Sequence, residues 1–504
     1  MMLIKLFQAE IFLCVILLFN LILNTRLICD PEKNFPILHK ETFVQNVILF
    51  VLVSALLVNS DLNGSIFNLF YCNQKTQNLK FFLIVTAFII TPFVKQSLVI
   101  QKINFIEYDI ILLLSILSGL LLISASDLLV VYILIEMQSL CFYVLASYRK
   151  TSAFSTEAGI KYFIFGSLFS CLFLFGLSIL YGVTGSLSFH DLNLLSLFHY
   201  PKEFKNILDI SIYLITILFL FKLGVVPFHF WAPDVYEGSP LASTIIFSIL
   251  TKPILINLFI KWIFILGNLY LSLYKLLALV GLLSILVGTF LALKQKRLKK
   301  LIIYSSIAQV GFLLSSLSLN TYDGMVYTYF FLIIYILTSI LIWGNICLLY
   351  SFETTYNSFF KKTTVSLFTS NLSNIFDYNY AWAIIFVIIF FSIAGIPPFV
   401  GFLSKIYILL ELVYSKLQIL SVLILLISSV SIFYYIRIIK IIFFESVSKK
   451  WFTINKSQIV FEFYGLSTAF FFLTLFQTLL LIFFFFPNML INICHLFMLN
   501  SLYF

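Results

Sequence analysis

Four ionisable side chains interrupt long apolar segments of this 504-residue chain. Glu136 lies in the middle of the apolar stretch 128–145, and Lys222 precedes a proline by five residues. Lys252 and Lys405 lie in two further apolar segments, each close to prolines. A charge at the centre of a bilayer is unfavourable by about 2.5–3.5 kcal/mol, so four of them require pairing, hydration or a function. Amines and carboxylates in this setting can hold and release protons, and proton transfer is therefore the chemistry that we expect.

Each of these charges could instead extend to the membrane surface from a site near a helix end. This alternative is strongest for Lys252, because Lys261 marks the end of the same segment. His229 is a further candidate for a proton relay, although a hydrogen-bonded structural role is the more frequent one for such a residue. We expect Asp234 and Glu237 to stabilise the loop that follows His229.

The remaining residues that could bind metals are scattered. No two of the seven cysteines form a CxxC pair, and the five histidines are equally dispersed. The pattern therefore suggests neither an iron–sulfur cluster nor a structural zinc, and no glycine-rich nucleotide motif is found. We expect the chain to bind no redox cofactor, nucleotide or metal itself. The cysteines are Cys14, Cys29, Cys72, Cys141, Cys171, Cys347 and Cys494.

Composition restricts the elements that can position these side chains. Hydrophobic residues make up 62% of the chain and charged residues 10%, against about 25% in soluble domains. A water-soluble fold is excluded, and unbroken apolar runs favour helices over a transmembrane barrel. We predict an all-α polytopic membrane protein with about 14 transmembrane helices. The apolar segments lie near 7–24, 43–59, 80–100, 108–124, 127–147, 158–183, 207–231, 240–266, 270–293, 300–319, 324–351, 380–412, 418–444 and 460–487.

The basic residues are distributed unequally between the two sides of such a topology. Of 31 Lys and Arg residues, 20 lie in or beside loops that follow odd-numbered segments, 8 lie on the other side, and 3 lie inside segments. The positive-inside rule places the first group on the matrix or cytoplasmic side and both termini on the opposite side. The net charge of +10 is thus explained by membrane orientation, and no nucleic-acid partner is expected.

Prolines interrupt the seventh and twelfth segments. A proline at membrane depth frees backbone carbonyl groups, which only a polar or hydrated interior tolerates, and transporters build ion paths from such broken helices. The lysine precedes the break in the seventh segment and follows it in the twelfth, as an inverted repeat of five helices requires. We therefore predict N-terminal helices in 1–104, repeats in 105–267 and 268–445, and a C-terminal helix and tail in 446–504.

Several stretches resemble the antiporter-like membrane subunits of proton-pumping NADH:quinone oxidoreductase, respiratory complex I. The most specific is FKLGVVPFHFWAPDVYEGSP at 221–240. STEAGIKYF at 155–163 is typical of the subunit 2 branch and not of subunits 4 and 5. KLIIYSSIAQVG at 300–311, AGIPPFVGFLSK at 394–405 and YYIR at 434–437 also fit. The resemblance covers about 105–445, and the first hundred residues match in hydropathy only.

The resemblance implies roles for the four buried charges in proton translocation. Glu136 corresponds to the helix-five glutamate, Lys222 to its helix-seven lysine partner, Lys252 to the helix-eight lysine and Lys405 to the terminal helix-twelve lysine. Movement or neutralisation of the Glu136 charge would then change the proton affinity of Lys222. Gln309 replaces a histidine that many relatives have in helix ten. Because glutamine does not titrate, a continuous relay of side chains through the centre is in doubt.

The family also implies the surroundings of the chain. NADH, FMN, iron–sulfur clusters and ubiquinone are expected elsewhere in the complex, and subunit 4, small membrane subunits and lipids are expected as partners. The abundance of Phe, Ile, Leu, Asn and Lys is typical of AT-rich organelle genomes, so the mitochondrial inner membrane is the expected location, with a bacterial plasma membrane as the alternative. Alternative functions are a subunit of a cation/proton antiporter and a membrane-arm subunit that no longer pumps.

Overall fold

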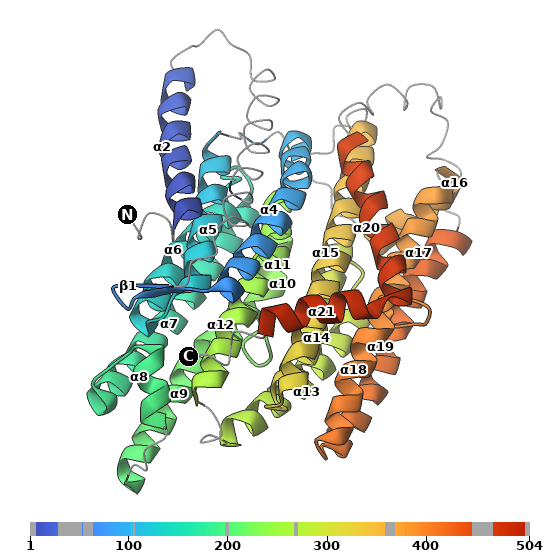
Figure 1. Cartoon of the computed structure of the whole chain (residues 1–504). Coiled ribbons are helices and arrows are strands. Elements are labelled where there is room, and N and C mark those ends of the chain that lie inside the picture. The colour runs from blue at the N-terminus through green and yellow to red at the C-terminus, as the bar shows by residue number, and fades with distance from the viewer. Residues whose placement is uncertain are drawn as a thin grey trace. The chain divides into compact units, whose positions relative to one another are not determined.

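The computed structural model describes residues 7–28, 53, 64–101, 103, 106–196, 201–266, 271–357, 368–378, 380–445 and 467–498, and these residues are almost entirely helical (Figure 1). The chain divides into two compact units. Unit 1 comprises Met1–Lys275 and His495–Phe504, and unit 2 comprises Leu276–Cys494. Each unit is described by itself.

Unit 1 consists of helices and one short hairpin. The helices are α2 (Gln8–Ile28), α4 (Gln74–Gln101), α5 (Ile106–Ser124), α6 (Leu128–Ser147), α7 (Ala153–Thr184), α8 (Phe189–Ser196), α9 (Lys202–Leu223), α10 (Trp231–Gly238), α11 (Leu241–Ile249), α12 (Thr251–Leu266) and the first residues of α13 (Leu271–Lys294). Strands β1 (Gly64–Ile66) and β2 (Phe70–Cys72) pair antiparallel. The sequence did not predict this hairpin or α8.

Polar residues at the helix ends explain where the helices of unit 1 begin. The Asp127 carboxylate accepts a hydrogen bond from the backbone N–H of Leu129 at 2.7 Å, and it caps the first turn of α6. Ser152 caps α7 in the same way. Asn73 and Thr76 exchange side chain to backbone hydrogen bonds of 2.9 Å ahead of α4. These caps fix the register of the helices that carry the buried charges.

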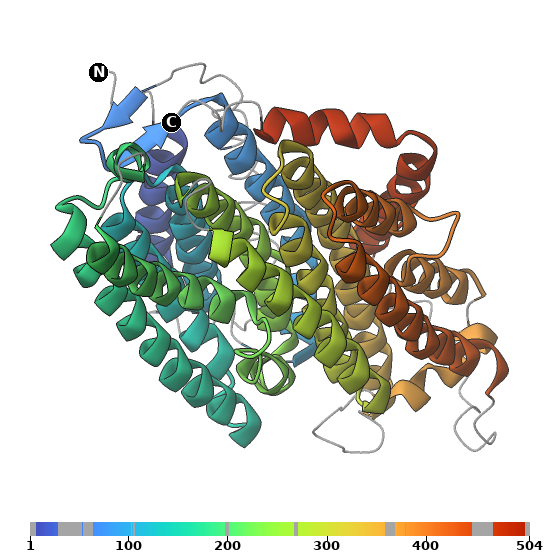
Figure 2. The same ribbon diagram turned by 90° about the horizontal axis from the view of Figure 1, so that it is seen from below.

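Unit 2 consists of helices that include one broken span. They are the remainder of α13, α14 (Leu298–Leu317), α15 (Tyr322–Asn357), the 3₁₀ helix η2 (Thr369–Asn374), α16 (Ile375–Tyr378), α17 (Tyr380–Ala394), α18 (Val400–Tyr414), α19 (Gln418–Phe444), α20 (Ser467–Phe485) and α21 (Pro487–Met498, whose last residues belong to unit 1). Helices α20 and α21 meet at a bend of 95°, which is visible in Figure 2.

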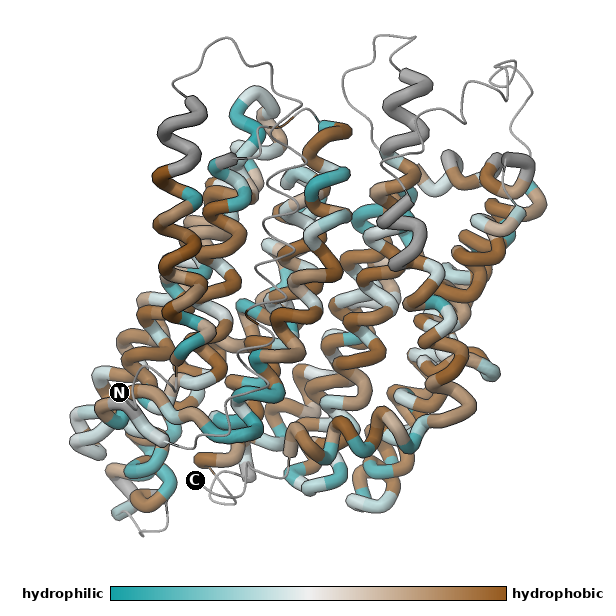
Figure 3. Tube along the Cα trace, turned by 45° about the horizontal axis from the view of Figure 1, so that its top comes forward, coloured by the Kyte–Doolittle hydropathy of each residue, from teal (hydrophilic) through white to brown (hydrophobic). Residues whose placement is uncertain are grey.

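The described residues contain ten helices that are long and apolar enough to cross a membrane, or eleven if α20 and α21 count as one span. Hydrophobic residues dominate these helices in Figure 3. The chain is therefore a multi-pass helical membrane protein, as predicted. The predicted segment 43–59 lies outside the described residues, apart from Val53. The total of fourteen helices and the inverted repeat stay predictions.

Both proline-containing spans are broken where the sequence predicted. Gly224, which has a φ of 73°, directly follows the last residue of α9, and Gly395, which has a φ of 79°, directly follows the last residue of α17. Glycine adopts this left-handed conformation without the steric penalty that a Cβ atom would bring. The peptide bonds before Pro227 and Pro398 are cis. Each break thus leaves a helix C-terminus with carbonyl groups to satisfy inside an apolar span.

Candidate functional site

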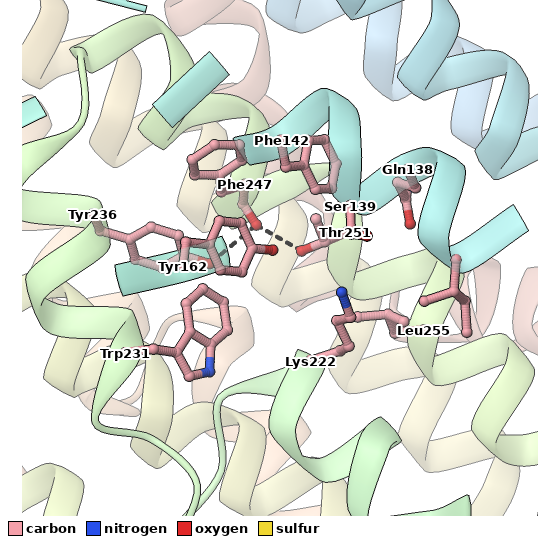
Figure 4. A pocket seen from close by; sticks show the side chains of 11 residues that line it. Gln138, Ser139, Phe142, Tyr162, Lys222, Trp231, Tyr236, Phe247, Thr251 and Leu255 are labelled. Atoms are coloured by element: carbon pink, nitrogen blue, oxygen red, sulfur yellow. Dashed lines mark hydrogen bonds between the residues drawn. The ribbon is translucent and has the colours of Figure 1, made fainter. Parts of the chain in front are cut away.

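Lys222 lies in the last turn of α9, directly before the break in unit 1. The indole N–H of Trp231, at the start of α10, donates a hydrogen bond of 2.9 Å back to the carbonyl of Phe221. This bond ties the segment after the break to the helix before it. Figure 4 shows Trp231 and Lys222 at the same cavity. The break therefore positions the lysine instead of leaving it on a free helix end.

The ammonium group of Lys222 is enclosed by aromatic rings. Its Nζ lies 5.8 Å from the centre of the Tyr143 ring and 6.0 Å from that of Tyr162, and only 8% of the residue is exposed. Within the described part of the chain, Nζ has no hydrogen-bond partner. Cation–π contacts at these distances attract a cation more weakly than an ion pair does. Lys222 is thus buried without a fixed acceptor, which is unusual for an amine.

Glu136 faces the same region from the middle of α6. Its Oε2 accepts a hydrogen bond of 3.3 Å from the hydroxyl of Ser139, and its Oε1 has no hydrogen-bond partner among the described residues. The described side chains include no ion pair within 4.0 Å between Glu136 and Lys222, although the carboxylate is near enough to act on the lysine charge. The two opposite charges therefore interact through space without direct contact.

A cavity of about 10 Å³ lies beside the Lys222 ammonium. Gln138, Ser139 and Thr251 supply its polar lining, together with Lys222 itself. Figure 4 shows these side chains converging on one space, with the Thr251 hydroxyl donating to the carbonyl of Phe247 at 2.6 Å. A cavity of this size is at the lower limit for one water molecule. Such a water would lie beside the Lys222 ammonium and the side chains of Gln138, Ser139 and Thr251.

Lys252 and Lys405 have a different environment from Lys222. Lys252 Nζ donates a hydrogen bond of 2.5 Å to the carbonyl of Leu223, the last residue of α9. Lys405 Nζ donates to the carbonyls of Ile393 and Ala394, at 2.9 and 2.7 Å, at the end of α17. A cation at a helix C-terminus is stabilised by the helix dipole and satisfies carbonyl groups that have no partner in the helix. Each of these lysines therefore caps the broken span of its unit.

The structure places three of the four predicted charges in unit 1 and one in unit 2. Glu136, Lys222 and Lys252 come from α6, α9 and α12, and α12 also contributes Thr251 to the cavity wall. Lys405 lies on α18 of unit 2, with its Nζ 5.4 Å from the centre of the Phe312 ring. The contacts of Lys405 resemble those of Lys252 and not those of Lys222, the residue to which the sequence symmetry relates it.

The remaining sequence candidates have weaker contacts with this site. His229 is buried, and its Nδ1 has no hydrogen-bond partner within the described residues. Asp234 accepts a hydrogen bond of 3.2 Å from Lys161, which also pairs with Glu157 at 2.7 Å. The STEAGIKYF motif thus ties α7 to α10, which supports a structural role for Asp234. Gln309 is half-buried on α14.

Sequence reasoning missed a second group of buried charges in unit 1. Lys80 on α4 forms an ion pair of 2.5 Å with Glu10 on α2, and the side chains are only 1% and 5% exposed. Lys261 on α12 is buried and donates to the carbonyls of Ile123 and Ala125 at the end of α5. All of these residues lie near segment ends, where the sequence suggests surface-reaching side chains. Only the packing shows that they are enclosed.

The described residues include no group of three or more His, Cys, Asp and Glu side chains that could hold a metal ion. The six cysteines in these ranges are free thiols. Nothing in the described geometry thus provides a ligand set for a metal.

A family model described as NADH:quinone oxidoreductase/Mrp antiporter, transmembrane, matches residues 125–433. NADH-quinone oxidoreductase subunit N of Pelagibacter ubique is 32% identical over 492 residues, which cover 96% of this chain and 97% of that protein. The chain belongs to the subunit N/chain 2 family of NADH:quinone oxidoreductases. NADH-ubiquinone oxidoreductase chain 2 of Marchantia polymorpha is 35% identical over 421 residues, which cover 80% of this chain and 81% of the relative.

The fold of this subunit N/chain 2 family member is found in a solved assembly. A chain of respiratory complex I from Thermus thermophilus superimposes with a TM-score of 0.74 at 22% identity, covering 96% of this chain and 98% of that one. The family model begins at the loop before α6 and ends within α19. It therefore includes Glu136, Lys222, Lys252 and Lys405, whereas α2 and α4 with Glu10 and Lys80 lie outside it.

Proposed function

We propose that this subunit N/chain 2 family member translocates protons in the membrane arm of NADH:quinone oxidoreductase, driven by redox chemistry in other subunits. The observation that supports this most strongly is Lys222, a buried ammonium without a hydrogen-bond partner in the described residues, close to a carboxylate that it does not contact. Such a group can exchange its proton when the partner charge moves. NADH, FMN, iron–sulfur clusters and quinone would be bound by other chains.

The proposed sequence of events uses the residues of each unit in turn. When Glu136 is ionised and near, it favours protonated Lys222, and when it moves away or is neutralised, burial favours the neutral amine. The released proton would pass through the cavity beside Ser139 and on toward Lys252. Lys405 would be the terminal station in unit 2. Movement of one charge against 100 mV requires about 2.3 kcal/mol, which a change in the distance between the Glu136 and Lys222 charges would supply.

The proposed location is the mitochondrial inner membrane, with both termini on the intermembrane-space side and the basic loops in the matrix. Other membrane-arm subunits, including subunit 4 and the small subunits, would be its partners. His229 would assist the relay if its buried ring titrates.

A cation/proton antiporter subunit is the second candidate function, because the matched family model includes Mrp antiporters.

The test replaces Glu136 by glutamine, which keeps the shape of the side chain and removes its charge. We expect Glu136→Gln to lower the number of protons moved per NADH oxidised in proteoliposomes, with normal assembly on native gels. Glu157→Gln is the matched control, because Glu157 is an exposed carboxylate that pairs with Lys161 on α7. Full pumping by a normally assembled Glu136→Gln complex would show that the Glu136 charge near Lys222 has a structural role only.

A further inference from the structure

Gln138 lines the cavity beside Lys222 and has no part in the proposed sequence of proton transfers. Its side chain extends from α6 and is 4% exposed, and its amide nitrogen Nε2 has no hydrogen-bond partner among the described residues. Figure 4 shows Gln138 and Lys222 at the same space, with Leu255 beside them. Buried amide donors are normally hydrogen-bonded, so an unpartnered one in the wall of a polar cavity indicates a place for a small polar molecule.

Gln138 and Glu136 lie on different sides of α6. Two residues correspond to about 200° around a helix, so the two side chains point in nearly opposite directions. The cavity wall combines Gln138 with Thr251 and Leu255 of α12, and Glu136 is not part of it. Lys222 thus has a carboxylate toward one side of α6 and, toward the other, a cavity with a neutral amide next to α12.

The hydroxyl groups of the cavity already donate their protons elsewhere. Ser139 and Thr251 both donate to backbone carbonyls, at 2.9 and 2.6 Å, so their oxygen atoms remain available as acceptors. The amide nitrogen of Gln138 and the ammonium of Lys222 offer N–H groups that the described residues leave unpaired. One water molecule in this cavity could therefore accept from the amide and the ammonium and donate to both hydroxyl oxygens, which would satisfy all of its hydrogen bonds.

We propose that Gln138 is a positioning residue that holds a water molecule against Lys222 and so directs the release of its proton toward α12. This inference rests on the proposed function. Because the Gln138 amide occupies one lone pair of the water, the other lone pair faces the ammonium. One N–H bond of Lys222 breaks, one O–H bond forms on this water, and one proton of the water leaves on the α12 side. The amide does not titrate, so it stays a partner of the water whether Lys222 is charged or neutral.

The first test varies the Gln138 side chain. Gln138→Met keeps the length of the side chain and removes the amide, so the water loses the donor that orients it. We expect the pumping rate per assembled complex to fall roughly fivefold, which is less than the usual effect of losing a proton-transfer group, because Lys222 itself remains. Gln138→Asn keeps the amide and should retain most of the pumping.

Gln77→Met is the matched control for Gln138→Met. Gln77 lies on α4 of unit 1 and is 8% exposed, and its amide nitrogen likewise has no partner among the described residues, but it does not line the cavity. Its substitution should leave pumping unchanged. Normal pumping by an assembled Gln138→Met complex, or an equal loss in Gln138→Met and Gln138→Asn, would overturn the proposal. An equal loss would mean that the volume of the side chain matters and not its amide.

A second test applies even if methionine prevents assembly, and it exchanges the groups on the two sides of α6. Gln138→Glu places a carboxylate at the cavity, where it would favour the protonated form of Lys222 and hold its proton. The double variant Glu136→Gln/Gln138→Glu keeps one carboxylate and one amide near Lys222 but reverses their sides. We expect this double variant to pump no better than Glu136→Gln alone. Restored pumping would show that the side on which the amide lies is unimportant, and it would overturn the proposal.

Glu136→Gln, measured in parallel, distinguishes this inference from the proposed function. If Glu136→Gln lowers pumping while Gln138→Met does not, only the role of Gln138 is refuted. If Glu136→Gln has no effect, the proposed function fails and this inference fails with it. A loss of pumping in both variants, with Gln138→Asn and Gln77→Met close to normal, supports both.

Discussion

The break after α9 in unit 1 and the break after α17 in unit 2 solve the same problem with different residues. In both, a glycine with positive φ ends the helix, and a lysine ammonium binds the carbonyl groups that lose their partners. In unit 1 that lysine is Lys252, which comes from α12, and Trp231 adds a second donor. In unit 2 one residue, Lys405 of the returning half-helix α18, binds two carbonyls.

This difference separates two roles of a buried lysine. Unit 1 has one lysine that caps the break and another, Lys222, that has no hydrogen-bond partner in the described residues and lies near Glu136. The corresponding half-helix of unit 2, 380–394, contains no charged residue. Lys405 would therefore have to cap the break and carry a proton with the same amine. A group with two roles should be more sensitive to substitution than either single-role group.

The largest effect is expected from Lys405→Ala. The substitution removes the donor to two buried carbonyls, each of which is then left unsatisfied at about 1–3 kcal/mol, and it also removes the proposed proton station. We expect pumping per assembled complex to fall by about tenfold or more. Lys405→Arg should restore stability but not pumping, because a guanidinium caps the carbonyls without releasing a proton.

The control for Lys405 is Lys296→Ala, which removes one positive charge from the exposed loop between α13 and α14. Its pumping should stay near normal, because other basic residues of that loop maintain the orientation of the chain. Equal proton ratios in Lys405→Ala, Lys405→Arg and Lys296→Ala would remove Lys405 from the proton path. Lys405 would then only cap the break in unit 2.

The sequence predicted both breaks, because glycine and proline have local conformational preferences that act within any apolar span. It also predicted that Lys222 is buried, whereas Glu136, in the middle of α6, is only half-buried. It did not predict which lysine caps which break, because Lys252 and Leu223 are joined only by the packing of α12 on α9. The Glu10–Lys80 ion pair was missed for the same reason, as its partners are 70 positions apart.

A smaller effect is expected from Gly395→Ala, and it tests the link between the break and Lys405. The alanine Cβ would lie 2.8 Å from Cδ of Lys405, so the lysine would have to leave the carbonyls. Gly185→Ala is the matched control, because Gly185 has a φ of 74° and no atom within 4 Å of an added Cβ.

Both glycine variants should lose about 1–2 kcal/mol through the positive φ, measured as thermal stability of the assembled complex. Only Gly395→Ala should also lose pumping, by a few-fold, if Lys405 must sit on its two carbonyls to work. Identical pumping in the two variants would show that the exact position of the Lys405 amine is unimportant. Pumping would then depend on the break in the helix of unit 2 and not on the contact of Lys405 with the two carbonyls.

The smallest effect is expected from Trp231→Phe, which removes one of the two donors at the break of unit 1. Phenylalanine can still stack on Tyr162, whose ring centre lies 4.7 Å from that of Trp231. The carbonyl of Phe221 keeps its hydrogen bond from the backbone of Gly224 at 2.9 Å, so it is not left unsatisfied. The loss should therefore be about 0.5–1.5 kcal/mol, with pumping almost unchanged.

Trp382→Phe in unit 2 is the matched comparison for Trp231→Phe. The Trp382 indole also donates a hydrogen bond of 2.9 Å, but its acceptor is the side-chain oxygen of the buried Asn345, which has this one donor among the described residues. That oxygen would be left without a partner, so Trp382→Phe should lower the thermal stability of the complex more than Trp231→Phe does. If Trp231→Phe were the more damaging of the two, Lys252 could not hold the end of α9 alone. The break of unit 1 would then depend on its second donor, Trp231, as well as on Lys252.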